Sequence, residues 1–122
     1  MQFLLLPHID EASWQALPKS VQTERIAAFP PFGEALKSAG AFVEAYQPQP
    51  SYKTATVRVQ DGKTVVSEGP LAKSPQQLSG VYVIEVSDRE TALSWAARLP
   101  ASSYGAVEVR PVFAPPAAAG RS

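Results

Sequence analysis

The sequence predicts an α+β fold, in which one sheet carries two main helices on one face and a β-hairpin is inserted between its strands. Three observations predict it. Strand-like and helix-like segments follow one another as strand, helix, strand, hairpin, strand, helix, strand. Asp61-Gly62 stands between two β-prone runs, as in a two-residue hairpin turn. Residues 3–6 and 81–86 are apolar almost throughout, which is typical of strands covered on both faces.

The N-terminal third contributes a strand and a helical region. The apolar run from Phe3 to Leu6 stops at Pro7 and favours a central strand. From Glu11 to Gly40 the apolar spacing is helical, and we expect Pro30-Pro31 to divide this region into two helical pieces. Gly40 supplies the left-handed cap of the second piece. The buried stripe of that piece is expected at Phe32, Ala35, Leu36 and Ala39.

A further strand is expected from Ala41 to Tyr46, and the hairpin follows it. Because a type I′ turn requires positive φ at Gly62, we expect Gly62→Val to cost about 1 to 2 kcal/mol of stability. One face of the hairpin is apolar, with Glu68 at its far end, where a carboxylate is unexpected. The predicted pairs are Gln60 with Lys63, Val57 with Val66, and Ala55 with Glu68, and the apolar face is Ala55, Val57, Val59 and Val66.

The C-terminal half supplies the remaining elements. A loop from Gly69 to Ser79 leads into a strand from Val81 to Val86. Residues 87–90 match a capping box, so we expect a helix that starts at Asp88 and stops before Pro100. Its buried stripe is expected at Ala92, Leu93, Ala96, Ala97 and Leu99, with Trp95 at the boundary.

Together these elements predict a ferredoxin-like sheet with an inserted hairpin. The last strand alternates, so that Val107 and Val109 face one side while Glu108 and Arg110 face the other. Two helices can cover only one face of the sheet, whereas the central strands are apolar on both faces. Because a large uncovered apolar face is rare in monomers, we expect a homodimer in which the two sheets pack against each other.

Composition fits one soluble domain over residues 1–113, followed by a disordered tail over 114–122. The 122 residues carry no net charge, which argues against direct binding to nucleic acid. With no cysteine, one histidine and no phosphate-binding glycine loop, we expect no metal and no cofactor. The chain has no apolar run long enough to span a membrane and no basic leader, so we expect a cytoplasmic location.

Three segments carry a family resemblance: SEGPLAKSPQQLSGVYVIEV, DRETALSWAARLP and YGAVEVRPV. They are similar to D-G-P-F-x-E-x-K-E-Q-L-G-G-Y-Y-L-I-E, D-E-A-L-x-W-A-A-R-x-P and G-x-V-E-V-R-P-V, the patterns of YCII-related proteins of the DGPF branch. With FGEALKSAG and TVRVQDGK, the resemblance runs from about residue 32 to residue 112. It implies a small bacterial protein that forms a dimeric α+β barrel and has no settled activity. Some relatives are regarded as enzymes because a His-Asp pair lies in a cleft, and some domains are linked to sigma factors.

At the positions of the resemblance, Glu68 takes the place of the family aspartate, Leu71 that of the phenylalanine and Lys73 that of an acidic residue. The His-Asp pair has no counterpart, because His8 stands just after the first strand and no histidine lies in the helical stretch from Glu11 to Phe29. Whether the chain is an enzyme therefore stays open.

Four residues are candidates for a ligand cavity, each with a structural alternative: His8, Glu68, Tyr82 and Arg110. Glu68 is expected to be buried, as a base, as a ligand-binding group or as an acceptor for loop amides. Arg110 either holds an anionic ligand or joins an ion pair across strands or subunits. His8 is either an acid or base or incidental, and Tyr82, like Trp95, either packs in the core or an interface or stacks on a ligand.

Two functions fit this pattern. The first is a dimer that binds or weakly transforms a small polar metabolite between its sheets. The second is a non-catalytic interaction or regulatory module, connected with sigma-factor-dependent transcription through the family resemblance. Polar groups that converge on an enclosed volume of a few hundred Å³ favour the first, and a filled apolar seam favours the second.

Overall fold

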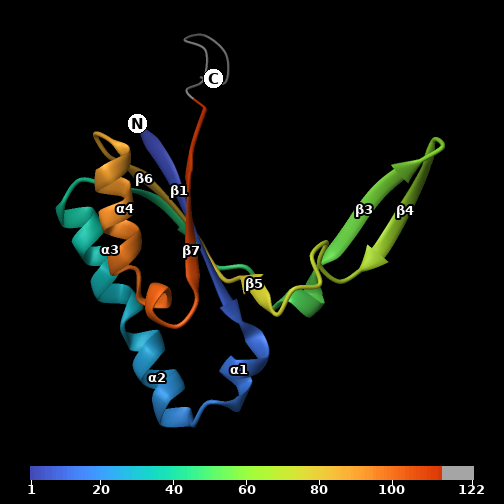
Figure 1. Ribbon diagram of the computed structural model, residues 1–122, viewed down its shortest axis with the longest axis horizontal. Coiled ribbons are helices and arrows are strands. Elements are labelled where there is room, and N and C mark those ends of the chain that lie inside the picture. The colour runs from blue at the N-terminus through green and yellow to red at the C-terminus, as the bar shows by residue number, and fades with distance from the viewer. Residues whose placement is uncertain (114–122) are drawn as a thin grey trace.

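The computed structural model describes residues 1–113. Seven strands, four α-helices and two 3₁₀ turns make up this part of the chain (Figure 1). In chain order they are β1 (Gln2–Asp10), α1 (Glu11–Ala16), α2 (Lys19–Ala27), α3 (Phe29–Ser38), β2 (Phe42–Tyr46), η1 (Ser51–Lys53), β3 (Ala55–Gln60), β4 (Lys63–Glu68), β5 (Gln76–Leu78), β6 (Val81–Glu85), α4 (Arg89–Arg98), η2 (Pro100–Ser103) and β7 (Ala106–Pro111).

The main sheet is antiparallel and has β1 at its centre. β6 pairs with the first half of β1 and β5 with its second half, while β7 pairs along the opposite edge of β1. β2 lies on the outer side of β6. His8 pairs with both Leu78 and Ala106, which places β5 and β7 on opposite sides of β1. The order β2, β6, β1, β7 is that of a ferredoxin-like sheet, so the predicted α+β fold is confirmed.

One face of this sheet packs against α3 and α4. Alternate residues of β1, among them Phe3 and Leu5, are fully buried there, because successive side chains of a strand point to opposite faces. The Phe32 ring of α3 meets the rings of Tyr82 and Trp95 edge-on, with centroids 5.3 and 6.0 Å away. The other core residues are Leu36, Ala41, Ile84, Val86, Ala92, Ala96, Leu99 and Ala101.

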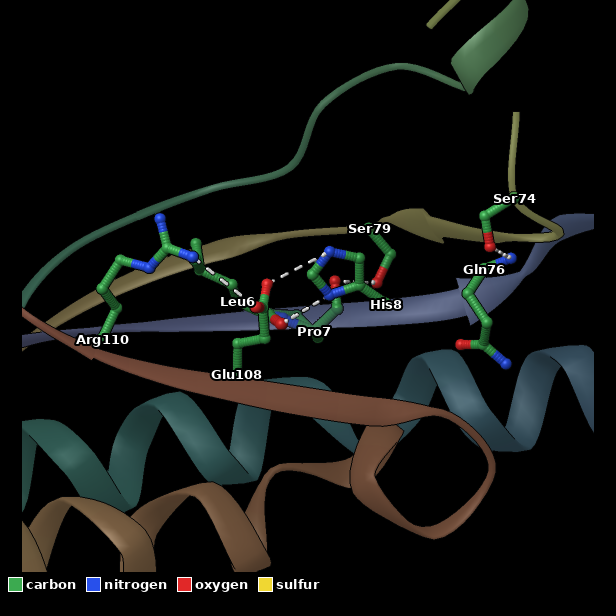
Figure 2. Close-up of polar contacts among 8 residues, drawn as sticks. All are labelled: Leu6, Pro7, His8, Ser74, Gln76, Ser79, Glu108 and Arg110. Atoms are coloured by element: carbon green, nitrogen blue, oxygen red, sulfur yellow. Dashed lines mark hydrogen bonds and ion pairs between the residues drawn. The ribbon is translucent and has the colours of Figure 1, made fainter. Parts of the chain in front are cut away.

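Within residues 1–113, no helix lies on the opposite face of the sheet, which we call the open face. Figure 2 shows both helices on one side of the sheet and the labelled polar side chains of β1 and β7 on the other. Leu4, Leu6, Val81 and Val83 form an apolar stripe along the open face, and each stays partly accessible. The expectation that two main helices cover one face only is confirmed.

The helical region differs from the prediction at its prolines. Three helices form instead of two, because Pro18 separates α1 from α2. Pro30 and Pro31 lie in the first turn of α3, where the missing N–H groups would have no helical partner in any case. The break between α2 and α3 lies at Ala28, just before this pair and not at it, whereas the predicted cap at Gly40 is found, with a φ of +70°. Pro7 does not end the first strand, which continues to Asp10.

Three local predictions in the C-terminal half also need correction. α4 begins one residue later than expected, and its cap is Asp88, whose carboxylate accepts a hydrogen bond from the Thr91 amide at 2.8 Å. Trp95 is buried rather than at the boundary, whereas Ala97 is exposed. Part of the predicted loop forms the short strand β5, which is held by the second half of β1.

The β3–β4 hairpin has the predicted register, with Gln60 opposite Lys63 and Ala55 opposite Glu68. Asp61 and Gly62 have φ values of 53° and 75°, as a type I′ turn requires. The hairpin forms a separate two-stranded sheet and projects from the rest of the molecule (Figure 1). Glu68 is therefore exposed, and the prediction that it is buried and hydrogen-bonded is wrong for the single chain. The prediction of a disordered tail at 114–122 lies outside the described residues.

Candidate functional site

A polar cluster of His8, Glu108 and Arg110 lies on the open face, along the middle of β1 and the adjoining strand β7 (Figure 2). Nε2 of His8 is 3.6 Å from Oε1 of Glu108, and a terminal nitrogen of Arg110 is 3.7 Å from Oε2 of the same carboxylate. One carboxylate therefore joins two basic side chains, and we call these three residues the Glu108 cluster.

The alternation of two strands produces this arrangement. β1 and β7 pair so that Leu4 lies opposite Arg110 and Leu6 lies opposite Glu108. Because paired residues share a face and the period of a strand is two, His8 lies on the same face as Glu108 and Arg110. The cluster thus lies beside the apolar stripe, on the β7 side of the open face.

Backbone contact fixes the orientation of the His8 ring. Nδ1 lies 2.9 Å from the carbonyl oxygen of Leu6, which can only accept, so Nδ1 carries a hydrogen and donates it. This leaves Nε2 directed at Glu108. A neutral ring presents the Nε2 lone pair there, and a protonated ring forms an ion pair with the carboxylate.

The cluster contributes little to the stability of the chain by itself. The side chains of His8, Glu108 and Arg110 are 26%, 54% and 66% exposed. Exposed ion pairs of this kind contribute about 0 to 1 kcal/mol, because water screens the charges. In the single chain the cluster thus has no large stabilising effect that would account for it.

The structure brings together two of the four candidate residues, His8 and Arg110. Tyr82 lies on the helix-covered face, where burial, and to a smaller extent the nearby Tyr104, raises the pKa of its hydroxyl. Tyr82 is partly buried and packs against the core. Glu68 lies at the base of the hairpin, opposite Ala55. Sequence reasoning placed Glu108 beside Arg110 but did not name it as a site residue, although the V-E-V-R alternation was the available signal.

Comparison with known proteins agrees with the geometry of the fold. The model of the YCII-related domain matches residues 1–115. The chain belongs to the YCII-related family. An uncharacterized protein of Rhizobium meliloti (strain 1021) is 38% identical over 65 residues, which is 52% of each chain, so the match spans about half the length of this relative. These findings confirm the family that the sequence motifs indicated, while the DGPF branch stays a prediction.

Two hollows in this YCII-related chain lie away from the Glu108 cluster. A hollow of about 590 Å³ lies between α2, α3 and η2, where Arg25 stacks over the Tyr104 ring at 4.0 Å. A second, of about 310 Å³, lies at the base of the hairpin between α1 and the loop before β5. Both are open to solvent, so neither is the enclosed cavity, within residues 1–113, that would favour binding of a metabolite.

Over the described residues of the YCII-related chain, no group of three or more His, Asp or Glu side chains is placed to hold a metal ion. In the same part of the chain, no helix is both long and apolar enough to cross a membrane.

Proposed function

We propose that this YCII-related protein is a homodimer that binds a small anionic metabolite between two facing sheets, at the Glu108 cluster. The observation that carries the proposal is an uncovered sheet face with an apolar stripe, beside which His8 and Arg110 both lie against the carboxylate of Glu108. Leu4, Leu6 and Val83 would be covered by a second copy, because a large uncovered apolar face is rare in monomers.

Burial by a second sheet changes what the cluster can do. In the single chain, water screens Arg110 and Glu108, whereas a space of low dielectric strengthens each of their interactions. Arg110 offers a planar fork of donors that matches a carboxylate or a phosphate. An anion entering this space competes with Glu108 for Arg110, so Glu108 regulates how tightly the anion is held.

His8 adds a group that can transfer protons. Its Nδ1 is already engaged by Leu6, so Nε2 is the atom that meets a ligand or passes a proton to it. The weak transformation of a bound metabolite would use this atom. Because a chain without cysteine needs no oxidising compartment, we keep the cytoplasm as the location in this proposal.

The test is a thermal-shift screen with a panel of small carboxylates and phosphate esters, followed by calorimetry on those that raise the melting temperature. Arg110→Gln should abolish the shift, because it removes the fork of donors. Glu108→Gln should increase the affinity several-fold, because it frees both basic groups from their internal partner. Arg89→Gln is the matched control, since Arg89 is an exposed arginine at the start of α4.

If no compound of the panel binds, or if Arg110→Gln binds as well as the wild type, the ligand site proposed here is wrong. A dimer without ligand would then favour the alternative, an interaction or regulatory module, including one that acts with sigma factors.

A further inference from the structure

The β3–β4 hairpin has an apolar face that nothing in residues 1–113 covers. Opposite residues of an antiparallel pair share a face, so Val57, Val59 and Val66 lie together on one side. They are 60%, 70% and 56% exposed. The other side carries Arg58 and Lys63, which belong in water. The hairpin is therefore amphipathic, with one face suited to contact.

The base of the hairpin holds it away from its own sheet. The Gly69 amide donates to the Thr54 carbonyl at 2.7 Å, and the Thr56 hydroxyl donates to the Gly69 carbonyl at 2.9 Å. Further back, the Ser51 amide donates to the carboxylate of Glu11 in α1, at 2.9 Å. These bonds give the hairpin a defined outward direction (Figure 1). Since a lone two-stranded hairpin is only marginally stable in water, this projecting element needs a surface to pack on.

The open face of a second copy fits that requirement in size. A strand of six residues extends about 20 Å, and four paired strands are about 19 Å across, so one hairpin reaches over the whole sheet. The open face presents Leu4, Leu6 and Val83 to the three valines. The same chain thus carries two uncovered apolar surfaces that match each other, as a two-fold symmetric interface requires.

The charges also match at one place, the β7 side of the open face, whereas Glu44 and Glu85 lie on the β2–β6 side of the same face. The apolar face of the hairpin carries a single charged group, Glu68, at its base. The Glu108 cluster on the open face holds two basic side chains against one carboxylate. When two copies pair, Glu68 of the partner subunit adds the second carboxylate, while Arg58 and Lys63 stay in solvent.

We propose that the β3–β4 hairpin of each copy lies across the open face of the other copy and closes the cavity there, with its carboxylate Glu68 turned toward the Glu108 cluster. This inference rests on the proposed dimer and deepens it, because the ligand site is then complete only when a second chain contributes to it. It also gives Glu68 a partner that the single chain lacks.

Cross-linking tests the placement directly, because the natural chain contains no cysteine. Chains carrying Val57→Cys are mixed with differently tagged chains carrying Leu6→Cys, allowed to exchange, and treated with a short bis-maleimide. We expect a cross-linked heterodimer at least five times more abundant than with Arg58→Cys, the matched control one residue away on the opposite face of the hairpin.

A second variant keeps the test independent of cross-linking geometry. Val57→Glu puts a charge on the apolar face and should weaken dimerisation at least tenfold in sedimentation. Val65→Glu, the same change on the other face, should alter it by no more than about twofold. Both chains should fold alone as the wild type does, since Val57 and Val65 lie outside the core.

The outcomes separate the two proposals. If the wild type is a dimer but Val57→Cys and Arg58→Cys cross-link equally, or if Val57→Glu dimerises normally, the hairpin placement is wrong and the dimer stands. In a double variant with Leu6→Cys and Val57→Cys, a cross-link that forms only within one chain would mean that the hairpin folds onto its own sheet. This result would contradict the placement of the hairpin on the other copy. A wild-type monomer overturns both proposals.

Discussion

Gly105 joins η2 to β7 at a point where the backbone leaves no room for a side chain. A Cβ there would collide with the carbonyl oxygen of His8 and would lie 3.2 Å from both the Ala101 oxygen and Ile9 Cγ2. The Gly105 amide also donates to Ala101 at 2.7 Å, which closes the turn. The close approach allows β7 to start pairing at His8, so this glycine is a condition for the Glu108 cluster.

We therefore predict that Gly105→Ala destabilises the protein by about 3 kcal/mol, because the clash is with backbone that cannot swing away. Denaturant unfolding measures the loss. Gly33→Ala in α3 is the control, since a Cβ at Gly33 meets nothing within 4 Å. This control should gain up to about 1 kcal/mol from helix propensity. Equal effects from the two substitutions would contradict the close approach at Gly105.

Asp88 gives a prediction that depends on pH. Hydrogen bonds from the Thr91 hydroxyl, the larger cause, and from the Thr91 amide lower the pKa of the Asp88 carboxyl. A lowered folded-state pKa contributes stability above the unfolded pKa, about 3.9, and this contribution is lost as pH falls through the folded value.

Between about pH 5 and pH 2 the wild type should thus lose more stability than Asp88→Asn, which keeps an acceptor at the cap but does not titrate. Helix content followed by circular dichroism during denaturation at each pH measures the difference. Asp61→Asn at the hairpin turn removes one carboxylate elsewhere and serves as the control. Parallel pH profiles for the wild type and Asp88→Asn would mean that the cap does not contribute as described.

At the residue scale, the sequence predicted on which face of its strand a side chain lies, but not which side chains of another strand lie beside it. The alternation in β7 placed Glu108 and Arg110 on one face, as found. The contact between His8 and Glu108 joins residues one hundred positions apart, and it depends on the register between β1 and β7. Nothing local encodes that register, because it follows from how both strands pack on the helices.

Among the elements, local chemistry decided which predictions succeeded. The hairpin register followed from the Asp61-Gly62 turn, which needs only neighbouring residues. The burial of Glu68 could not be predicted in the same way, because it depends on where the whole hairpin lies relative to the sheet. Pro18 separates two helices by the same missing N–H that was used for Pro30-Pro31, but the apolar spacing that continues across it favoured one helix there.

For the hairpin we predict that Gly62→Val acts locally. A β-branched residue at a φ of 75° costs about 1 to 2 kcal/mol. Because the hairpin pairs with no strand of the main sheet, this cost should appear as hydrogen exchange of the β3 and β4 amides that is about tenfold faster or more. Amides of β1 and β6 should exchange as in the wild type when both proteins are monomeric. Unchanged exchange in the hairpin would mean that its turn is not strained by valine.

For the whole molecule, the central feature is an imbalance between two sheet faces. α3 and α4 bury one face around Phe3, Leu5 and Ile84, while the open face and the projecting hairpin keep apolar surface in contact with water. The order of elements and the two doubly apolar strands predicted this imbalance from the sequence. What the sequence did not predict is that the hairpin, too, stands uncovered. For this reason we propose that a second copy covers both surfaces.

Sedimentation velocity of the full chain at micromolar concentration tests the central claim most directly. The account predicts a single species of twice the 13.0 kDa chain mass, because two copies cover each other's open face. A stable species of 13.0 kDa at these concentrations would contradict it, since the open face and the hairpin would then both remain in water.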